Sequence, residues 1–248
     1  MHTKDPETAI GGRSGRFPST QWSAIISLRD GNPDREVALE SLIRMYWKPV
    51  YKYLRIRWRK SNEDAKDLTQ SFFARLIEKD FIRTYDPSIS RFRTFLRTCL
   101  DGFASNELKA ANARKRGGAF RFESLDFHQA EAEVRNSPPT PEECFEREWI
   151  RSLFSLTLEE LRARLEETGR KTHYLIFEKY DIERSSEEKL SYDDLAVEFG
   201  IPVSAVTNYL SFARREFRKI ALTKLREITG SESEYRSEAR RVFGARVD

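Results

Sequence analysis

Residues 91–116, RFRTFLRTCLDGFASNELKAANARKR, form the stretch on which the predicted fold depends. Apolar side chains recur in it at a spacing of three or four residues, which predicts a helix with one buried face made by Phe92, Phe95, Leu96, Cys99, Leu100, Phe103, Leu108 and Ala111. The other side is expected to face water or an acidic partner and carries Arg93, Thr94, Arg97, Thr98, Asp101, Ser105, Asn106, Lys109, Asn112 and Arg116. Seven Lys and Arg residues against Asp101 and Glu107 leave this stretch at +5.

The basic side of this helix has two possible explanations. Charge runs on helices are most often solvated surface. A function in binding single-stranded nucleic acid is favoured by the polar turn just before the helix, residues 84–90 (TYDPSIS), and by the alternation of aromatic and arginine residues just after that turn. Unstacked bases stack on aromatic rings, and phosphates pair with cations. The pattern by itself leaves both explanations open.

The composition indicates a non-membrane protein with room for two domains. The chain has 248 residues, of which 39% are hydrophobic and 34% charged, with a net charge of +4. This net charge is a weak sign of a polyanionic partner, but residues 117–148 carry eight acids against three bases, so basic and acidic stretches alternate. Cys99 and Cys144 are too few for a disulfide framework, and the three histidines are scattered. We therefore expect a reduced, cytoplasmic protein without metal or other cofactor, with no membrane span and no signal-peptide core.

The first half of the chain is expected to be helical after a disordered start at residues 1–18. Ser61 to Asp64 has the form of a capping box that begins a helix reaching about Lys79. In this helix Leu68, Phe72 and Leu76 are predicted to point inward, with Phe73 and Ile77 as further candidates for that side, whereas Asp64, Asp67 and Gln70 point outward. The two aspartates either compensate the helix dipole, at under about 1 kcal/mol each, or meet a partner.

A second helical unit is predicted after a linker at residues 118–140, which contains the run SPPTP. Ser191 caps the segment YDDLAVEF, Gly200 turns the chain, and Pro202 begins a long helix, an order typical of a helix-turn-helix. Other antiparallel helix pairs with a glycine turn share this pattern. The outer side of the second helix has the placement of a recognition helix in a major groove and carries Ser204, Thr207, Asn208, Ser211, Arg214, Arg215 and Arg218. Residues 229–248 are expected to be a frayed helical tail.

Several motifs together resemble the extracytoplasmic-function (ECF) class of bacterial sigma factors. They are DAKDLTQSFF (64–73), FRTFL (92–96), SYDDLA (191–196), GIP (200–202) and AV (205–206), and their order and spacing match over residues 19 to about 225. The resemblance implies an all-α protein with two small helical domains joined by a flexible linker. A sigma-two-like domain (19–117) would bind core RNA polymerase and the minus-ten element. A sigma-four-like helix-turn-helix domain (141–228) would bind the minus-thirty-five element.

The resemblance also implies three groups of site residues. The outward side of the acidic helix would dock on the clamp of the largest polymerase subunit, the polymerase flap being a further contact, through Asp64, Asp67, Leu68, Gln70 and Phe73. Minus-ten DNA would be held by Tyr85, Asp86, Ser88, Ser90, Arg91, Arg93, Arg97, Asn106 and Lys109. Minus-thirty-five DNA would be read by the seven outer residues from Ser204 to Arg218 named above. Whether an anti-sigma factor or the C-terminal tail controls activity stays open.

Two hypotheses about function follow from the sequence. The first is a transcription initiation factor that acts with RNA polymerase, and the alternative is a stand-alone helix-turn-helix regulator that does not need polymerase. An enzyme is not expected, because the sequence shows no phosphate-cradling glycine loop with its lysine, no metal cluster and no nucleophile with a plausible partner. Substituting Asp64 or Asp67 separates the two hypotheses, since only the first needs these carboxylates.

Overall fold

The computed structural model describes residues 33–78, 81–111, 130, 140–183 and 190–244. Within these ranges the chain forms helices and turns but no β-strand, so the predicted all-α class is confirmed. The predictions for residues 1–18 and for nearly all of the 118–140 linker concern residues outside these ranges. The helices are α2 (Pro33–Arg57), α3 (Asn62–Glu78), η1 (Phe81–Thr84), α4 (Phe92–Ala111), α6 (Pro141–Glu167), α7 (Lys171–Phe177), η2 (Glu178–Ile182), α8 (Tyr192–Phe199), α9 (Val203–Ile228) and α10 (Glu232–Phe243).

Local sequence signals set most of the helix starts. The hydroxyl of Thr140 accepts a hydrogen bond from the backbone N–H of Glu143, at 3.2 Å, and Pro141 occupies the first turn of α6. Ser61 caps α3 in the same way, by accepting from the N–H of Asp64 at 3.1 Å. Such caps satisfy N–H groups that have no partner within the helix. The predicted starts of α3 and α6 are therefore confirmed.

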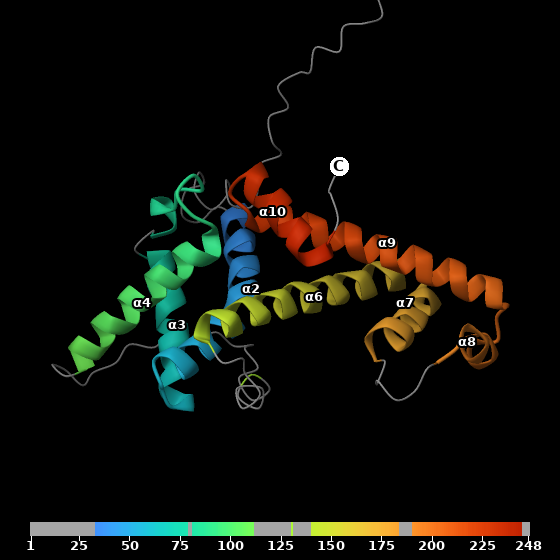
Figure 1. Cartoon of the computed structure of the whole chain (residues 1–248), viewed down its shortest axis with the longest axis horizontal. Coiled ribbons are helices and arrows are strands. Elements are labelled where there is room, and N and C mark those ends of the chain that lie inside the picture. Colours follow the sequence, from blue (N-terminus) through green and yellow to red (C-terminus); the bar gives the residue numbers. More distant parts are fainter. Residues whose placement is uncertain (1–32, 79–80, 112–129, 131–139, 184–189, 245–248) are drawn as a thin grey trace, which may run out of the picture.

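Two hydrophobic cores share the long helices α6 and α9, which run side by side between them (Figure 1). The first core joins α2, α3 and α4 to the N-terminal half of α6 and to α10, and the most extensive helix contact is that between α2 and α6. The second core lies among α7, α8, the C-terminal half of α6 and α9. The cores thus divide within α6, whereas the sequence placed the domain boundary near residue 140. Hydrophobic periodicity shows that α6 is buried but not which neighbours bury it.

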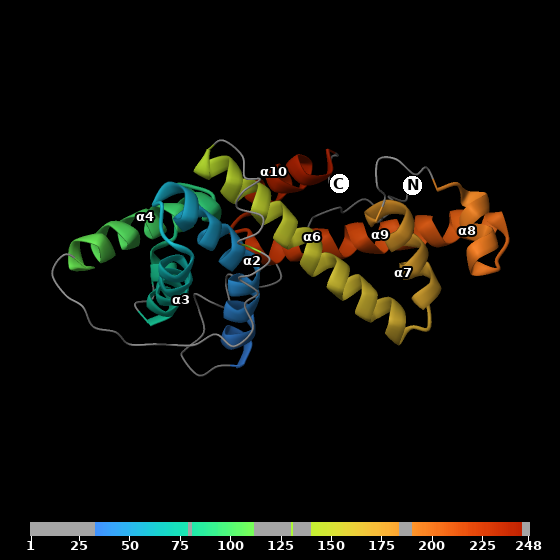
Figure 2. The same cartoon turned by 90° about the horizontal axis from the view of Figure 1, so that it is seen from below.

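Helix α10 corrects the expectation of a frayed C-terminal tail. Ser231 caps it by accepting from the N–H of Glu234, and Gly244 ends it with a left-handed backbone (φ 64°). Tyr235 and Ala239 are buried in the first core. Figure 2 shows α10 folded back from the end of α9, and the ring of Phe243 near the end of α10 lies against that of Phe154 in the middle of α6. The tail prediction was wrong because the segment's charges balance, which hides the one stripe of α10 that packs.

A buried ion pair joins α2 to α6. The Nζ atom of Lys52 lies 2.8 Å from Oε2 of Glu148, and both side chains are almost completely shielded from water. Glu148 also pairs with the exposed Arg151 one turn further along α6, at 2.6 Å. Charges buried at such a contact hold its geometry, because neither can lose its counter-charge cheaply.

Tyr53 makes the stability of the first core sensitive to alkali. Its hydroxyl donates to Oδ2 of Asp101 at 3.1 Å, and burial together with Asp101 and Glu142 raises the pKa of Tyr53 to about 12. A raised pKa means that the stability is present below the unfolded-state pKa of about 10 and is lost as the pH rises toward 12. The free energy of unfolding of the wild type is expected to fall between pH 10 and 12, and in Tyr53→Phe this fall should be smaller by up to about 2 kcal/mol. Urea denaturation across this pH range measures it, and an unchanged slope would contradict it.

Candidate polymerase and DNA interface

The acidic side of α3 lies on the protein surface. Asp64 and Asp67 are exposed, and Leu68 and Gln70 are half-buried. Phe73 does not belong to this surface: it is 1% exposed and its ring meets that of Phe72 edge-on, with centroids 5.5 Å apart. Its predicted polymerase contact was therefore wrong. Two adjacent phenylalanines both reach the core because the buried stripe of α3 is broad, extending over Ala65, Thr69, Phe72, Phe73 and Leu76.

The loop between η1 and α4 is only partly open to a ligand. Asp86 accepts hydrogen bonds from the N–H and the hydroxyl of Ser88, at 2.8 and 2.7 Å, and these bonds lower the pKa of Asp86. Asp86, Ser88 and Arg91 are exposed and Ser90 is half-buried, as a DNA-binding loop requires.

Tyr85, at the start of this loop, is buried, although it was predicted to be among the residues that hold minus-ten DNA. Its ring packs against Phe92 and Phe95, with centroids 5.3 and 5.2 Å away. Its hydroxyl donates to the carboxylate of Glu234 on α10, at 3.2 Å. The rings of Phe92 and Phe95 and the carboxylate of Glu234 on α10 together cover Tyr85.

Arg93 departs most from the prediction, because it is 3% exposed although the helix pattern placed it on the water-facing side. Its guanidinium forms a two-pronged pair with Glu238 of α10, with both N–O distances 2.9 Å, and it also donates to Glu146 of α6 at 3.2 Å. It lies 3.9 Å from the ring centroid of Trp149. Helices α6 and α10 thus cover the first turn of α4 from the side that periodicity marked as polar.

The rest of α4 remains more accessible. Arg97 is half-buried, 5.8 Å from the ring centroid of Phe145, and Asn106 and Lys109 are exposed. The C-terminal half of α4 therefore keeps the polar surface that the sequence predicted, while its first turn does not.

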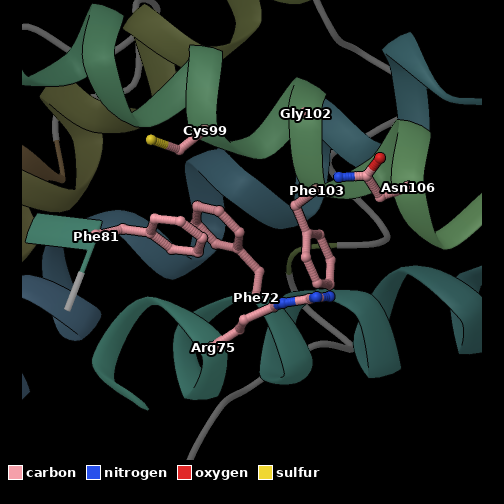
Figure 3. A pocket seen from close by; sticks show the side chains of 7 residues that line it. All are labelled: Phe72, Arg75, Phe81, Cys99, Gly102, Phe103 and Asn106. Carbon is pink, nitrogen blue, oxygen red and sulfur yellow. The ribbon is translucent and has the colours of Figure 1, made fainter. Parts of the chain in front are cut away.

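A pocket between α3, η1 and α4 was not predicted. Its volume is about 240 Å³ and Figure 3 shows its lining: three phenylalanine rings from three elements, with a guanidinium and an amide at the edge. Burial raises the pKa of the Cys99 thiol, so Cys99 is a neutral part of the wall. One residue in the sequence could have indicated this pocket: Gly102 in the middle of α4 has no side chain, so it leaves space there. The lining residues are Phe72, Arg75, Phe81, Cys99, Gly102, Phe103 and Asn106.

The helix pair α8–α9 has the predicted turn and outer face. Gly200 ends α8 with φ 62°, a backbone that favours glycine. Ser191 and Asp194 cap α8 reciprocally, and these hydrogen bonds lower the pKa of Asp194. The outer face of α9 is exposed at Ser204, Thr207, Asn208, Ser211, Arg214 and Arg215 and half-buried at Arg218.

Two arginines of this face already have partners within the chain. Arg214 donates twice to Asp181 of η2, with both distances 2.8 Å. Arg218 lies 5.2 Å from the ring centroid of Phe243 on α10. Arg215 differs from these two, because the ring that its guanidinium contacts, Phe212, belongs to α9 itself, with the ring centroid 5.4 Å away.

The fold and these surfaces define an all-α protein with an exposed acidic helix and two separate polar helix faces, a class suited to binding macromolecules. Among the described residues, no group of three or more His, Cys, Asp or Glu side chains could hold a metal ion. No described helix is long and apolar enough to cross a membrane.

A comparison with family models found a match, which covers part of the first half of the chain. Residues 42–114 match the model described as Sigma-70 region 2, and this range includes most of α2 and all of α3, η1 and α4. This segment is therefore similar to region 2 of sigma-70 factors, which supports the resemblance to sigma factors found in the sequence. A search of curated proteins and a search of solved structures each found no match.

Proposed function

We propose that this protein is a sigma factor of the ECF class that binds core RNA polymerase and directs promoter recognition and melting, acting as a binding protein and not as an enzyme. The observation that carries the proposal is the exposed pair Asp64 and Asp67 on α3, inside the segment that matches sigma-70 region 2. Exposed carboxylates on a well-capped helix can face a basic partner without the cost of breaking a contact within the chain. The polymerase clamp is the partner that the resemblance implies.

The other surfaces divide the promoter between them in this proposal. The 85–91 loop and α4 hold the minus-ten strand, and α8–α9 act as a helix-turn-helix on the minus-thirty-five duplex. Opening a duplex costs unstacking and unpairing energy, and a bound strand offsets it through stacking, about 1–3 kcal/mol per base, and through phosphate neutralisation. The pocket beside Asn106 supports this use of α4, because the exposed ring of Phe81 offers a stacking surface and the amide can hydrogen-bond a base edge.

Neutralising Asp64 and Asp67 together is the test of the proposal. We expect Asp64→Asn/Asp67→Asn to weaken binding to purified core polymerase about tenfold or more, since that factor corresponds to about 1.4 kcal/mol and central charged contacts commonly contribute as much. Fluorescence anisotropy with labelled chain and core enzyme measures the affinity. Glu167→Gln, an exposed carboxylate at the end of α6, is the matched control and should leave it unchanged. Failure of the wild-type chain to bind core enzyme would refute the proposal.

A stand-alone DNA-binding regulator is the second candidate. It is favoured by one observation: the outer face of α9 is exposed, whereas Tyr85 and Arg93 of the minus-ten surface are covered. This candidate expects the isolated chain to bind specific duplex DNA tightly and to be indifferent to the Asp64→Asn/Asp67→Asn change. Promoter opening that requires core polymerase would exclude it.

A further inference from the structure

Helix α10 supplies carboxylates to the surface that the proposed function assigns to the minus-ten strand. Oε1 of Glu234 accepts from the backbone N–H of Phe92, at 3.0 Å, in the first turn of α4. Oε2 of the same residue accepts from the hydroxyl of Tyr85 at 3.2 Å. The first turn of a helix presents N–H groups with no partner in the helix, together with the positive end of its dipole, and so it binds carboxylate or phosphate. Glu234 therefore occupies an anion site at the start of α4.

Glu238, one turn along α10, occupies the neighbouring cations. It is 1% exposed and binds Arg93 through both oxygens, and its Oε1 lies 3.2 Å from Nη1 of Arg91. Arg91 also donates to the hydroxyl of Ser237 at 3.1 Å. A guanidinium fork accepts carboxylate and phosphate with the same geometry. The hydrogen-bond acceptors of α10 that face the loop and α4 thus occupy the positions that the phosphates of a DNA strand would need.

Helix α10 is held by side chains that pack in the first core, and a short connection joins it to the rest of the chain. Tyr235 and Ala239 fill the first core, and the ring of Phe243 lies against that of Phe154, with centroids 6.3 Å apart. Only residues 229–231 connect α10 to the end of α9. Rotation about this connection would take Glu234 and Glu238 away from the first turn of α4 without unfolding α2, α3 or α4, and would leave Arg93 in contact with Glu146 and Trp149 of α6.

We propose that α10 is a built-in competitor of single-stranded DNA: it occupies the surface formed by Tyr85, Arg91, Arg93 and the start of α4, and it must leave before a strand can bind there. The inference rests on the proposed function in that it takes this surface to be the strand-binding one. The protein in this arrangement is closed to the minus-ten strand while its polymerase-facing carboxylates on α3 stay exposed. Binding of the strand and release of α10 are then two sides of one equilibrium.

Two full-length variants test the competition. Glu234→Gln/Glu238→Gln removes the charges that occupy the anion site, and Ala239→Glu puts a charge where α10 packs in the core, which an undocked helix tolerates. The probe is a short fluorescent single-stranded DNA of random sequence, and anisotropy gives its affinity for the chain alone. We expect both variants to bind it about tenfold tighter than the wild type or more, corresponding to at least about 1.4 kcal/mol. Glu232→Gln, a single Glu→Gln change at a carboxylate that pairs with Arg226 and Arg236 and not with α4, should bind like the wild type.

A wild-type measurement makes the test independent of how the variants fold. Hydrogen exchange of residues 232–243 should become faster when the DNA is present at saturation. Unchanged exchange, or variants that bind the DNA no better than the wild type, would overturn the competition. The affinity of the wild-type chain for core polymerase is measured separately. If the wild-type chain does not bind core polymerase, the proposed function is refuted. Tighter DNA binding by the variants would still support the competition in that case.

Discussion

Arg93→Ala is expected to lower the free energy of unfolding by about 3–5 kcal/mol, because it leaves a buried carboxylate without its two-pronged partner. Glu238 is 1% exposed, and Arg93 supplies two of its hydrogen bonds at 2.9 Å. The change also removes the guanidinium from the face of Trp149, 3.9 Å from the ring centroid. Urea denaturation followed by circular dichroism measures the effect, because nearly all of the described chain is helical.

A double variant separates the buried charge from the packing. Arg93→Met/Glu238→Leu replaces the pair with apolar side chains of similar size, and such replacements of buried ion pairs are often close to neutral. We expect it to cost much less than Arg93→Ala alone. Arg97→Gln, on the next turn of the same helix, is the single-site control and should change stability by less than about 1 kcal/mol. Equal losses for Arg93→Ala and Arg97→Gln would show that the pair with Glu238 does not hold α10 in solution.

Glu148→Ala is the second large effect, also about 3–5 kcal/mol of unfolding free energy, because it takes the carboxylate away from a fully buried ammonium. The Nζ atom of Lys52 lies 2.8 Å from this carboxylate at the contact between α2 and α6. Because α6 carries residues of both cores, the loss is expected to loosen both units together, so that far-ultraviolet and tyrosine signals keep a single transition at lower denaturant.

The matched control for this prediction is the exposed partner of the same carboxylate. Arg151→Gln removes the 2.6 Å ion pair on the water side of Glu148, and exposed pairs contribute at most about 1 kcal/mol. A loss after Glu148→Ala no larger than that after Arg151→Gln would mean that Lys52 finds water when its partner is removed. The contact between α2 and α6 would then not depend on the ion pair.

The sequence predicted features that depend on neighbouring residues in the chain. Ser191, Asp194 and Gly200 bound α8 where the capping signals placed it, since a cap is made of groups three residues apart. The exposed carboxylates were predicted for the same reason: Asp64 follows Ser61 in the first turn, Asp67 lies one turn further along, and both lie off the apolar stripe. The outer face of α9 was equally visible from its spacing.

The missed features depend on partners far along the chain. Arg93 fits the polar side of α4, and its spacing contains no sign of Glu146 or Glu238, which lie 53 and 145 residues away. The side on which Phe73 lies was left open by the spacing, and the pocket beside Phe103 was missed, because the width of a buried stripe depends on how many neighbours surround a helix. The packing of the C-terminal helix was missed because opposite charges cancel in composition even when one side chain, Glu238, is buried.

The sequence by itself determined the helices, their caps, the acidic side of α3 and the sigma-70 region 2 motifs, because these follow from hydrogen bonds and side-chain spacing within a few residues. Only the tertiary structure decided that α6 joins two cores and that α10 covers the first turn of α4. The physical reason is that burial of a charge depends on which distant side chain supplies its counter-charge, and local spacing carries no information about that choice.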